Sequence, residues 1–547
     1  MAKATRYTPE MIEEYTRKGF WQEITFSQIW DRNALLYPEK MALVDSNNRL
    51  TWGQARLWID RVALGFLKLG LKKGDLIVIQ LPNCVEGIML RMACEKTGIL
   101  CLPILHSFRQ KEVEEIIDRM QPVAMVVQRI FRGFDHFEMA SGLREKRPWL
   151  KHIFVTGEDV PEGGISLKAM AAEPMEKTSP PNLLERDRCK ATEFSLILAT
   201  SGTTGFPKFI EYPICSTMCR ERSRNEDFKL TGEDIYGGIG PALGGPNGPI
   251  YYGFILVAAR VVLLDKFDPE KAMELIEKER ITFLPAVPAQ LNMMLKHPSF
   301  GKYDLSSLRC IWSSGATMPY DLGMEVERKM GRITQAYSAI DSSVGCEHTF
   351  DMSLEERVAT VGRPYAGAEV ILVDDDGRPA AKGEVGEVVV RGPGGVGGFY
   401  GDPESTWQAW SKDGWFHMGD LGKFDDRGNL TIVGRKKDVI IRGGQNIFPA
   451  EIEDLLTTHP KVSQAAVVRM PDALKGEKAC AYLVMKNNES LTFEEMILFL
   501  KSKNLATFKL PERLETVDTL PTVAAGQKVD KKVLEKDILA RMASHQT

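Results

Sequence analysis

Short apolar runs alternate with amphipathic stretches through the first two thirds of the chain. Residues 76–80 and 100–104 have the pattern of buried strands, and residues 84–96 between them have the spacing of a helix. Thr51 is placed to cap another helix, which ends at Gly70. Strand–helix–strand units with short loops are typical of a parallel sheet with helices on both faces. The pattern therefore predicts an α/β fold with a large N-terminal domain of parallel sheets.

Similar units continue to about residue 340. Residues 156–190 are rich in proline, glycine and charge, and we interpret them as a loop, whereas the segment after Lys208 has helix-like spacing. The predicted strands 308–312 and 333–337 both end in small polar residues. Because ligands of open α/β sheets bind at the carboxyl ends of strands, these positions are candidate site residues.

The pattern changes in the last third of the chain. Between about residue 360 and residue 434, short strands are separated by Asp/Gly turns, which predicts an antiparallel, β-rich subdomain. Residues 435–547 then combine strands, a Gly443-Gly444 turn, two helical stretches and a lysine-rich tail. The sequence predicts a large domain over residues 1–434 and a small α+β domain over residues 435–547.

The composition excludes several classes of protein. A length of 547 residues implies more than one domain, and a net charge of −4 gives no basic surface for nucleic acid. No apolar run is long enough to span a membrane, and the N-terminus lacks the apolar core of a secretion signal. The nine cysteines are scattered without a C-x-x-C pair, as expected for thiols in a reducing compartment. We therefore expect a cytoplasmic globular protein.

One polar stretch is a candidate for phosphate binding. It runs from Thr200 to Lys208, contains Pro207, and follows the apolar run 194–198. Its glycines leave backbone N–H groups open to an anion, its hydroxyls add donors, and the lysine adds a positive charge. Pro207 prevents a helix from starting at the lysine as it does in the P-loop of NTPases. Taken alone, the stretch fits a phosphate loop and a polar surface turn equally well.

Six stretches, in order, resemble the motifs of the adenylate-forming superfamily, which includes acyl-CoA synthetases, adenylation domains of peptide synthetases and luciferases. The resemblance covers nearly the whole chain, and six ordered motifs make coincidence negligible. The stretches are Thr200 to Lys208, Ser314-Gly315-Ala316, Gln335-Ala336-Tyr337-Ser338, Gly386-Glu387 through Pro393, Asp413-Gly414-Trp415 through Asp420, and Gly434-Arg435 through Glu453.

The resemblance implies an acid–thiol ligase. Such an enzyme joins a carboxylate to ATP, releases pyrophosphate, and passes the acyl group from acyl-AMP to the thiol of coenzyme A. It implies ATP and CoA as substrates and Mg²⁺ as a cofactor, held by Asp341 where the family usually has Glu. Lys208 would act as a mobile charge on the phosphates. The implied ATP/AMP-binding residues are Thr200, Ser201, Gly202, Thr203, Thr204, Gly205, Lys208, Gly315, Ala316, Thr317, Gln335, Ala336, Tyr337, Ser338, Asp420, Ile432 and Arg435.

Within this set, the resemblance implies distinct contacts to the nucleotide. Tyr337 would stack on the adenine, with Gly315 and Ala316 on the opposite face. Asp420 would accept hydrogen bonds from the ribose hydroxyls, with Arg435 assisting.

The family's C-terminal catalytic lysine has two possible counterparts. Counting forward from Pro521 places Gln527 at its position, whereas counting back from Asp530 places Lys528 there. A glutamine cannot supply the positive charge, so we favour Lys528 and a one-residue insertion.

The resemblance also implies that the C-terminal domain rotates between the two half-reactions. Lys437, two residues after Arg435, would be the hinge, and Arg442, Gly443 and Gly444 would line the path of the CoA thiol. Since the chain ends at residue 547 without a carrier domain, we expect a free-standing ligase, either monomer or homodimer.

The expected acid is cyclic. The sequence looks closest to the branch of dihydroxybenzoate-AMP ligases and cyclic-acid CoA ligases, yet Gly244 and Gly245 stand where aryl acid ligases place a His-Asn pair. An apolar recess favours an unsubstituted aromatic or alicyclic acid. The expected acid-pocket residues are Ala242, Gly244, Gly245, Ser314, Gly315 and Ile340.

Three alternatives stay open at this point. They are a medium-chain fatty acid as substrate, a carrier protein as acyl acceptor, and a binding protein without activity. The last is suggested by Ile340, Asp341 and Gln527, which depart from the family pattern.

Overall fold

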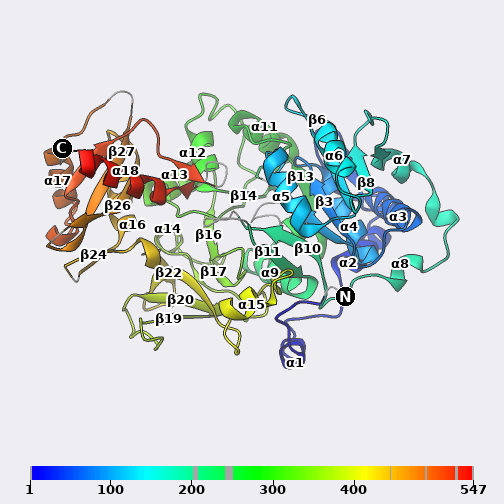
Figure 1. Cartoon of the computed structure of the whole chain (residues 1–547), viewed down its shortest axis with the longest axis horizontal. Coiled ribbons are helices and arrows are strands. Elements are labelled where there is room, and N and C mark those ends of the chain that lie inside the picture. The colour runs from blue at the N-terminus through cyan, green and yellow to red at the C-terminus, as the bar shows by residue number, and fades with distance from the viewer. Residues whose placement is uncertain are drawn as a thin grey trace.

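The computed structural model describes residues 3–200, 207–240, 251–443, 445–472, 474–486, 489–523 and 528–544 (Figure 1). Two large, mostly parallel sheets with helices form the N-terminal part of the chain, a four-stranded antiparallel sheet follows, and a mixed α+β domain forms the C-terminal end. This is the fold class that the sequence predicted. In Figure 1 the C-terminal elements, orange to red, lie at one end of the long axis.

The first sheet has nine strands and a parallel centre. Its edge strands β2, β17 and β18 are antiparallel to their neighbours, and every other pairing is parallel. In spatial order the strands are β18 (Arg363–Pro364), β17 (Gly345–Glu347), β16 (Ile333–Ser338), β15 (Cys310–Ser313), β14 (Phe283–Ala286), β12 (Ile235–Gly238), β13 (Arg260–Leu263), β1 (Met41–Val44) and β2 (Arg49–Thr51).

The second sheet has eight strands. Only β11 and β21 run antiparallel to their neighbours, at the edge next to β10. The strands in order are β21 (Gly398–Phe399), β11 (Phe209–Pro213), β10 (Phe194–Ala199), β4 (Leu100–Pro103), β3 (Leu76–Gln80), β5 (Ala124–Gln128), β8 (His152–Thr156) and β9 (Ile165–Ser166), with a separate hairpin of β6 (Ile130–Phe131) and β7 (Phe134–Asp135).

Helices lie in three layers, one between the two sheets and one on the outer face of each sheet. The groups that follow are given in that order: between the sheets, on the outer face of the second sheet, and on the outer face of the first sheet. The groups are α2 (Phe26–Leu36), α3 (Trp52–Lys68), α4 (Val85–Thr97), α9 (Ile214–Asp227) and α10 (Gly253–Leu256); α5 (Gln110–Met120) and α6 (His136–Glu145); and α11 (Pro269–Glu279), α12 (Pro288–Leu295) and α13 (Tyr320–Lys329).

The remaining helices of this part are short or peripheral, and two of them, α7 (Leu167–Ala172) and α8 (Leu183–Arg186), differ from the prediction. The segment 156–190, predicted as a loop, contains helices that pack against α3 and α4. Leu167 and Met170 are buried there, because the apolar residues in this polar stretch have helical spacing. The full set of remaining helices is α1 (Pro9–Arg17), α7, α8, α14 (Leu354–Ala359) and α15 (Pro403–Ala409).

The segment after Lys208 is a second correction. The chain first forms strand β11, and α9 begins only at Ile214. Phe209 and Ile210 are bulky and β-branched or aromatic, and β10 offers an open edge with which they pair. The predicted helix is therefore displaced by one strand, and the 200–208 stretch connects the antiparallel strands β10 and β11.

The antiparallel subdomain was predicted correctly. Its sheet is formed by β19 (Glu369–Val373), β20 (Gly386–Arg391), β22 (Phe416–Phe424) and β23 (Leu430–Arg435). In Figure 1 it is drawn in yellow, below the first parallel sheet.

The C-terminal domain has a sheet with helices on both faces, α16 and α17 on one and α18 on the other. Leu534 and Ile538 of α18 are buried, so the predicted lysine-rich tail is a helix that packs on the sheet. The elements are β24 (Ile440–Arg442), β25 (Gln445–Ile447), α16 (Pro449–Thr457), β26 (Val462–Asp472), β27 (Gly476–Met485), α17 (Phe493–Ser502), β28 (Arg513–Thr516), β29 (Thr522–Val523), β30 (Lys528–Val529) and α18 (Lys531–Ser544). Within the described ranges of the whole chain, no helix is long and apolar enough to cross a membrane.

Candidate active site

The carboxyl ends of β15 and β16 lie side by side in the first sheet. The two strands are parallel, and Ser313 at the end of β15 pairs with Gln335 of β16. The turn after β15 places Ser314 partly buried and Gly315, Ala316 and Thr317 exposed. Gly315 has a φ of 82°, a left-handed conformation that glycine adopts without strain. The structure thus places the predicted adenine-side residues on an accessible turn at a strand end.

Tyr337, Asp420 and Arg435 form one connected group. The hydroxyl of Tyr337 donates to Oδ2 of Asp420 at 2.7 Å, and Nε of Arg435 lies 3.2 Å from Oδ1 of the same carboxylate. Asp420 and Arg435 are also opposite each other in the β22–β23 pair. Burial, and then the neighbouring carboxylate, raises the pKa of Tyr337 well above its usual range, so the hydroxyl stays protonated and donates a hydrogen bond to Asp420.

Asp341 lies close to this group and to Lys208. Burial raises the pKa of the Asp341 carboxyl, and Lys208 and Arg435 oppose that rise with their positive charges. Two cations and the carboxylates of Asp341 and Asp420 are therefore within electrostatic reach of one another, although they come from three parts of the chain that are distant in sequence. Such a mixed-charge group suits a ligand with phosphates and hydroxyls.

The base of the predicted phosphate loop is a closed hairpin. The backbone N–H of Thr200 donates to the carbonyl of Lys208 at 2.9 Å, and the N–H of Lys208 donates to the Thr200 hydroxyl at 3.0 Å. Nζ of Lys208 lies 4.2 Å from the centre of the Phe399 ring. Ser201, Gly202, Thr203, Thr204 and Gly205 lie outside the described residues. The ends of the loop are thus fixed next to Asp341.

The other predicted nucleotide-binding residues fall on two strands. Gln335 and Ala336 are buried in β16, and the amide of Gln335 donates to the carbonyl of Arg357 at 2.8 Å, so that side chain is engaged within the protein. Ser338, at the end of β16, is exposed. Ile432 is half-buried in β23, three residues before Arg435.

The predicted C-terminal residues lie around the C-terminal sheet. Lys437 is exposed in a short 3₁₀ turn, and its carbonyl accepts a hydrogen bond from Arg469. Arg442 makes an ion pair with Glu512 at 2.5 Å. The N–H of Gly443 donates to the carbonyl of Lys475 at 2.8 Å, at a left-handed φ of 57°. Gly444 lies outside the described residues.

The backbone of Lys528 is part of β30, where it pairs with Val523 of β29. Gln527 lies outside the described residues. Lys528 begins β30, the second strand of this hairpin.

Only part of the predicted acid pocket is described. Ala242, Gly244 and Gly245 lie outside the described residues, whereas Ser314, Gly315 and Ile340 are present. Ile340 is half-buried, and its carbonyl accepts a hydrogen bond from the Tyr212 hydroxyl at 2.7 Å. The described part of the pocket therefore adjoins the Asp341 loop.

Sequence reasoning missed Tyr212, Arg220 and Tyr365, which hold the Asp341 loop from behind. Arg220 and Tyr365 both donate to the carbonyl of Ser343, at 2.6 and 3.0 Å. The helix α9 offered one signal: Arg220 and Arg224 are one helical turn apart on an otherwise buried element. Charged residues on a buried helix that follows a phosphate loop are worth testing as site residues.

The donor set fits Mg²⁺ that is shared with a nucleotide. No cluster of three metal-ligand side chains occurs in the part of the chain that the structure describes. Mg²⁺ in nucleotide sites usually takes one or two protein carboxylates and fills its other positions with phosphate oxygens and water. The partly buried carboxylate of Asp341, beside the base of the predicted phosphate loop, matches that requirement.

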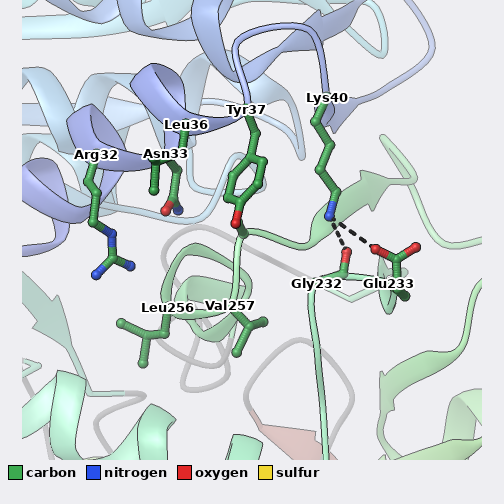
Figure 2. A pocket seen from close by; sticks show the side chains of 10 residues that line it. Arg32, Asn33, Leu36, Tyr37, Lys40, Gly232, Glu233, Leu256 and Val257 are labelled. Carbon is green, nitrogen blue, oxygen red and sulfur yellow. Dashed lines mark hydrogen bonds and ion pairs between the residues drawn. The ribbon is translucent and has the colours of Figure 1, made fainter.

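A surface pocket of about 440 Å³ lies elsewhere. It is formed by α2, the turn after it and the segments around Gly232 and Val257, and Figure 2 shows Nζ of Lys40 bonded to Gly232 and Glu233 beside it. The two contacts are 2.7 and 3.5 Å long. None of the predicted site residues lines it, so we place the candidate active site at the strand ends. The lining residues are Arg32, Asn33, Leu36, Tyr37, Lys40, Gly232, Glu233, Leu256, Val257 and Ala258.

Comparison with known proteins identifies the family. The model of the AMP-binding enzymes matches residues 30–400, and the model of the AMP-binding enzyme C-terminal domain matches residues 451–527. The chain therefore belongs to the AMP-binding enzyme family, the adenylate-forming enzymes whose motifs the sequence resembles.

Individual relatives cover almost the full chain. The medium-chain fatty-acid–CoA ligase of Escherichia coli (strain K12) is 32% identical over 96% of this chain and 93% of its own length. The 2-hydroxy-7-methoxy-5-methyl-1-naphthoate–CoA ligase of Streptomyces carzinostaticus is 31% identical over 96% of this chain and 95% of its own. The crystal structure of ATP-bound MatB from Rhodopseudomonas palustris matches with a TM-score of 0.81 at 26% identity, covering 94% of this chain and 99% of that one. These relatives confirm the predicted enzyme class, an acid–thiol ligase that forms an adenylate.

Proposed function

We propose that the chain is an ATP-dependent, AMP-forming ligase that joins a cyclic carboxylic acid to coenzyme A. The observation that carries the proposal is the group formed by Tyr337, Asp420 and Arg435 beside Asp341 and Lys208. It combines an acceptor for ribose hydroxyls, an aromatic ring for a base, cations for phosphates and a carboxylate for Mg²⁺. Each of these groups is required by an enzyme that binds ATP and neutralises a leaving pyrophosphate.

The proposed reaction has two steps, formation of the acyl-adenylate and transfer of the acyl group to CoA. In the first step a carboxylate oxygen of the acid bonds to the α-phosphorus of ATP, the bond to the bridging oxygen breaks, and pyrophosphate leaves. In the second step the sulfur of CoA bonds to the acyl carbon, the bond to the AMP oxygen breaks, and the thiol proton is released. Mg²⁺ held by Asp341 would supply positive charge to the phosphates.

The proposed roles of the chain's residues follow from these steps. The loop from Thr200 to Gly205 and Lys208 would hold the β- and γ-phosphates, Tyr337 would contact the adenine and Asp420 the ribose. Lys528 would approach the reacting carboxylate from the C-terminal domain and offset the negative charge that gathers when two anions meet.

The small domain is proposed to serve both steps. With residues 1–434 as the large domain and 435–547 as the small one, Lys437 lies at their junction, where an exposed turn can absorb a rotation. The Gly443–Gly444 segment, together with Arg442, would then line the entry of the CoA thiol, because a chain without side chains leaves room for the pantetheine arm. The positive φ of Gly443 supports a tight turn there.

The cyclic acid is favoured by residue types in the predicted pocket, where Gly244 and Gly245 leave space and no polar partners for ring hydroxyls. The name of the Streptomyces relative, a naphthoate–CoA ligase, supports a ring-shaped substrate. The name of the Escherichia coli relative supports the second candidate, a medium-chain fatty acid, for which the same open and apolar recess would suffice.

An acid panel tests the choice. Purified protein is incubated with ATP, Mg²⁺, labelled pyrophosphate and one acid at a time, and label entering ATP reports adenylation. We expect the highest kcat/KM for benzoate- and cyclohexanecarboxylate-type acids. A clear preference for octanoate would replace the cyclic acid with the medium-chain acid, and a preference for dihydroxybenzoate would contradict the pocket argument. Release of AMP with CoA, compared with release with an acyl carrier protein, identifies the thiol.

A further inference from the structure

The loop that carries Asp341 is held mainly through its backbone. It follows β16 and turns tightly, with the N–H groups of Ser342 and Ser343 both donating to the carbonyl of Ala339, at 3.2 and 2.8 Å. On one side of Asp341 the carbonyl of Ile340 accepts from the Tyr212 hydroxyl. The position of the Asp341 carboxylate is therefore set by the groups that anchor its neighbours.

The strongest anchor acts on the carbonyl of Ser343, two residues after Asp341. Nη1 of Arg220 donates to it at 2.6 Å, and the Tyr365 hydroxyl donates to it at 3.0 Å. The guanidinium carbon of Arg220 also lies 4.5 Å from the centre of the Tyr365 ring. Only 5% of Arg220 is exposed, so these contacts, and not solvent, fix the position of its guanidinium group.

Ser343 needs this support. Its φ of 58° lies in the left-handed region, which a residue with a side chain adopts at an energetic cost. Such conformations persist when surrounding contacts enforce them, and they occur often at functional sites. The two donors on the Ser343 carbonyl are contacts of this kind.

We propose that Arg220 is a positioning residue for the binding of Mg²⁺–ATP, acting through Ser343 on the Asp341 carboxylate. The proposal rests on the proposed function, because it assumes that Asp341 meets the metal ion of the nucleotide. A carboxylate on the short aspartate stem has less reach than a glutamate, so the loop that carries it has to be held closely. Arg220 and Tyr365 hold it through the two hydrogen bonds to the Ser343 carbonyl.

The first test replaces Arg220 by methionine, which keeps an unbranched apolar stem and removes the donors. ATP affinity is measured by titration calorimetry with Mg²⁺ and again with EDTA in its place. We expect the affinity for Mg²⁺–ATP to fall about tenfold, the lower end of the loss seen when a group that orients a metal ligand is removed. The affinity for metal-free ATP should be unchanged, and Arg220→Lys, which retains one donor, should recover part of the loss.

Arg222→Met is the matched control. Arg222 lies on the same helix and also donates to backbone carbonyls, those of Gly19 and Phe20, at 3.0 and 3.1 Å, but it does not contact the Asp341 loop. We expect its affinity for ATP to match the wild type under both conditions.

A second variant decides the matter if Arg220→Met does not fold. Tyr365→Phe keeps the ring and removes only one donor to Ser343, so a smaller loss, about threefold and again confined to Mg²⁺–ATP, is expected. Equal loss with and without Mg²⁺ in either variant, or no loss in a folded Arg220→Met protein, would overturn the positioning role. Wild-type protein that binds no ATP at all would instead refute the proposed function, and the positioning role with it.

Discussion

Replacing Asp420 by alanine is the most specific single test of the candidate nucleotide site. The residue is 9% exposed, and its carboxylate, a group that can accept about four hydrogen bonds, lies between the Tyr337 hydroxyl and Arg435. A hydrogen bond to a charged group contributes about 1.5–3 kcal/mol, so two at the lower end amount to about 3 kcal/mol, or roughly 100-fold in affinity. Asp420→Ala should weaken ATP binding by about that factor.

The assay compares two nucleotides so that a general structural effect cancels. ATP and 2′,3′-dideoxy-ATP each displace a fluorescent nucleotide from wild-type and variant protein. The wild type should prefer ATP by about 100-fold, whereas Asp420→Ala should bind both nucleotides about equally. Asp413→Ala, at an exposed turn of the same motif, serves as the control and should keep the preference. If Asp420→Ala retains the wild-type ratio, Asp420 does not bind the ribose.

Three further predictions concern charge and pH. Lys528→Ala should lower acid-dependent pyrophosphate exchange by about 100-fold or more, whereas Gln527→Ala should change it less than threefold; the reverse order would assign the role to Gln527. Asp341→Asn should raise the Mg²⁺ concentration for half-maximal exchange about tenfold, and an unchanged Mg²⁺ titration would remove Asp341 from the metal site. Burial lowers the pKa of His348 to about 4, so between pH 6.5 and 4 the unfolded chain binds a proton that the folded chain does not. Acidification to pH 5 should therefore cost about 2 kcal/mol of stability, and His348→Asn should lose less stability over the same interval in urea unfolding; equal losses would contradict the assignment.

The fold was largely predictable because hydrophobic periodicity reports burial. The runs that became β3 and β4 are buried on both faces, which is what a parallel sheet between two helical layers requires. The predicted cap of α3 is present, since the Thr51 hydroxyl accepts from the N–H of Gln54 at 3.3 Å. The strands β3 and β4 and the cap of α3 were predictable because they depend on residue types that are close together in the sequence.

Strand pairing or packing, and not the local pattern, decided the two elements β11 and α18, which differ from the prediction. β11 reads as part of a helix until the edge of β10 is available to pair with it. The lysine-rich sequence of α18 does not indicate a buried face, yet Leu534 and Ile538 pack against the C-terminal sheet. Tertiary contacts outweighed local propensity in both cases.

The candidate site shows the same division. Tyr337 and Asp420 were recognisable because each lies in an ordered motif, although the hydrogen bond between them joins residues 83 positions apart. Arg220 carries no motif, and its importance follows only from the carbonyl that it reaches across 123 positions. Residues that act through the backbone of another segment leave little trace in a linear pattern.

As a member of the proposed ligase class, the protein should form an acyl-adenylate before it uses a thiol. The most direct measurement incubates the protein with ATP, Mg²⁺ and the preferred acid without CoA, and follows the bound products by mass spectrometry. We expect enzyme-bound acyl-AMP and one pyrophosphate for each active site, with AMP and a thioester appearing only after CoA is added. Formation of ADP and phosphate, or no reaction of ATP until CoA is present, would contradict it.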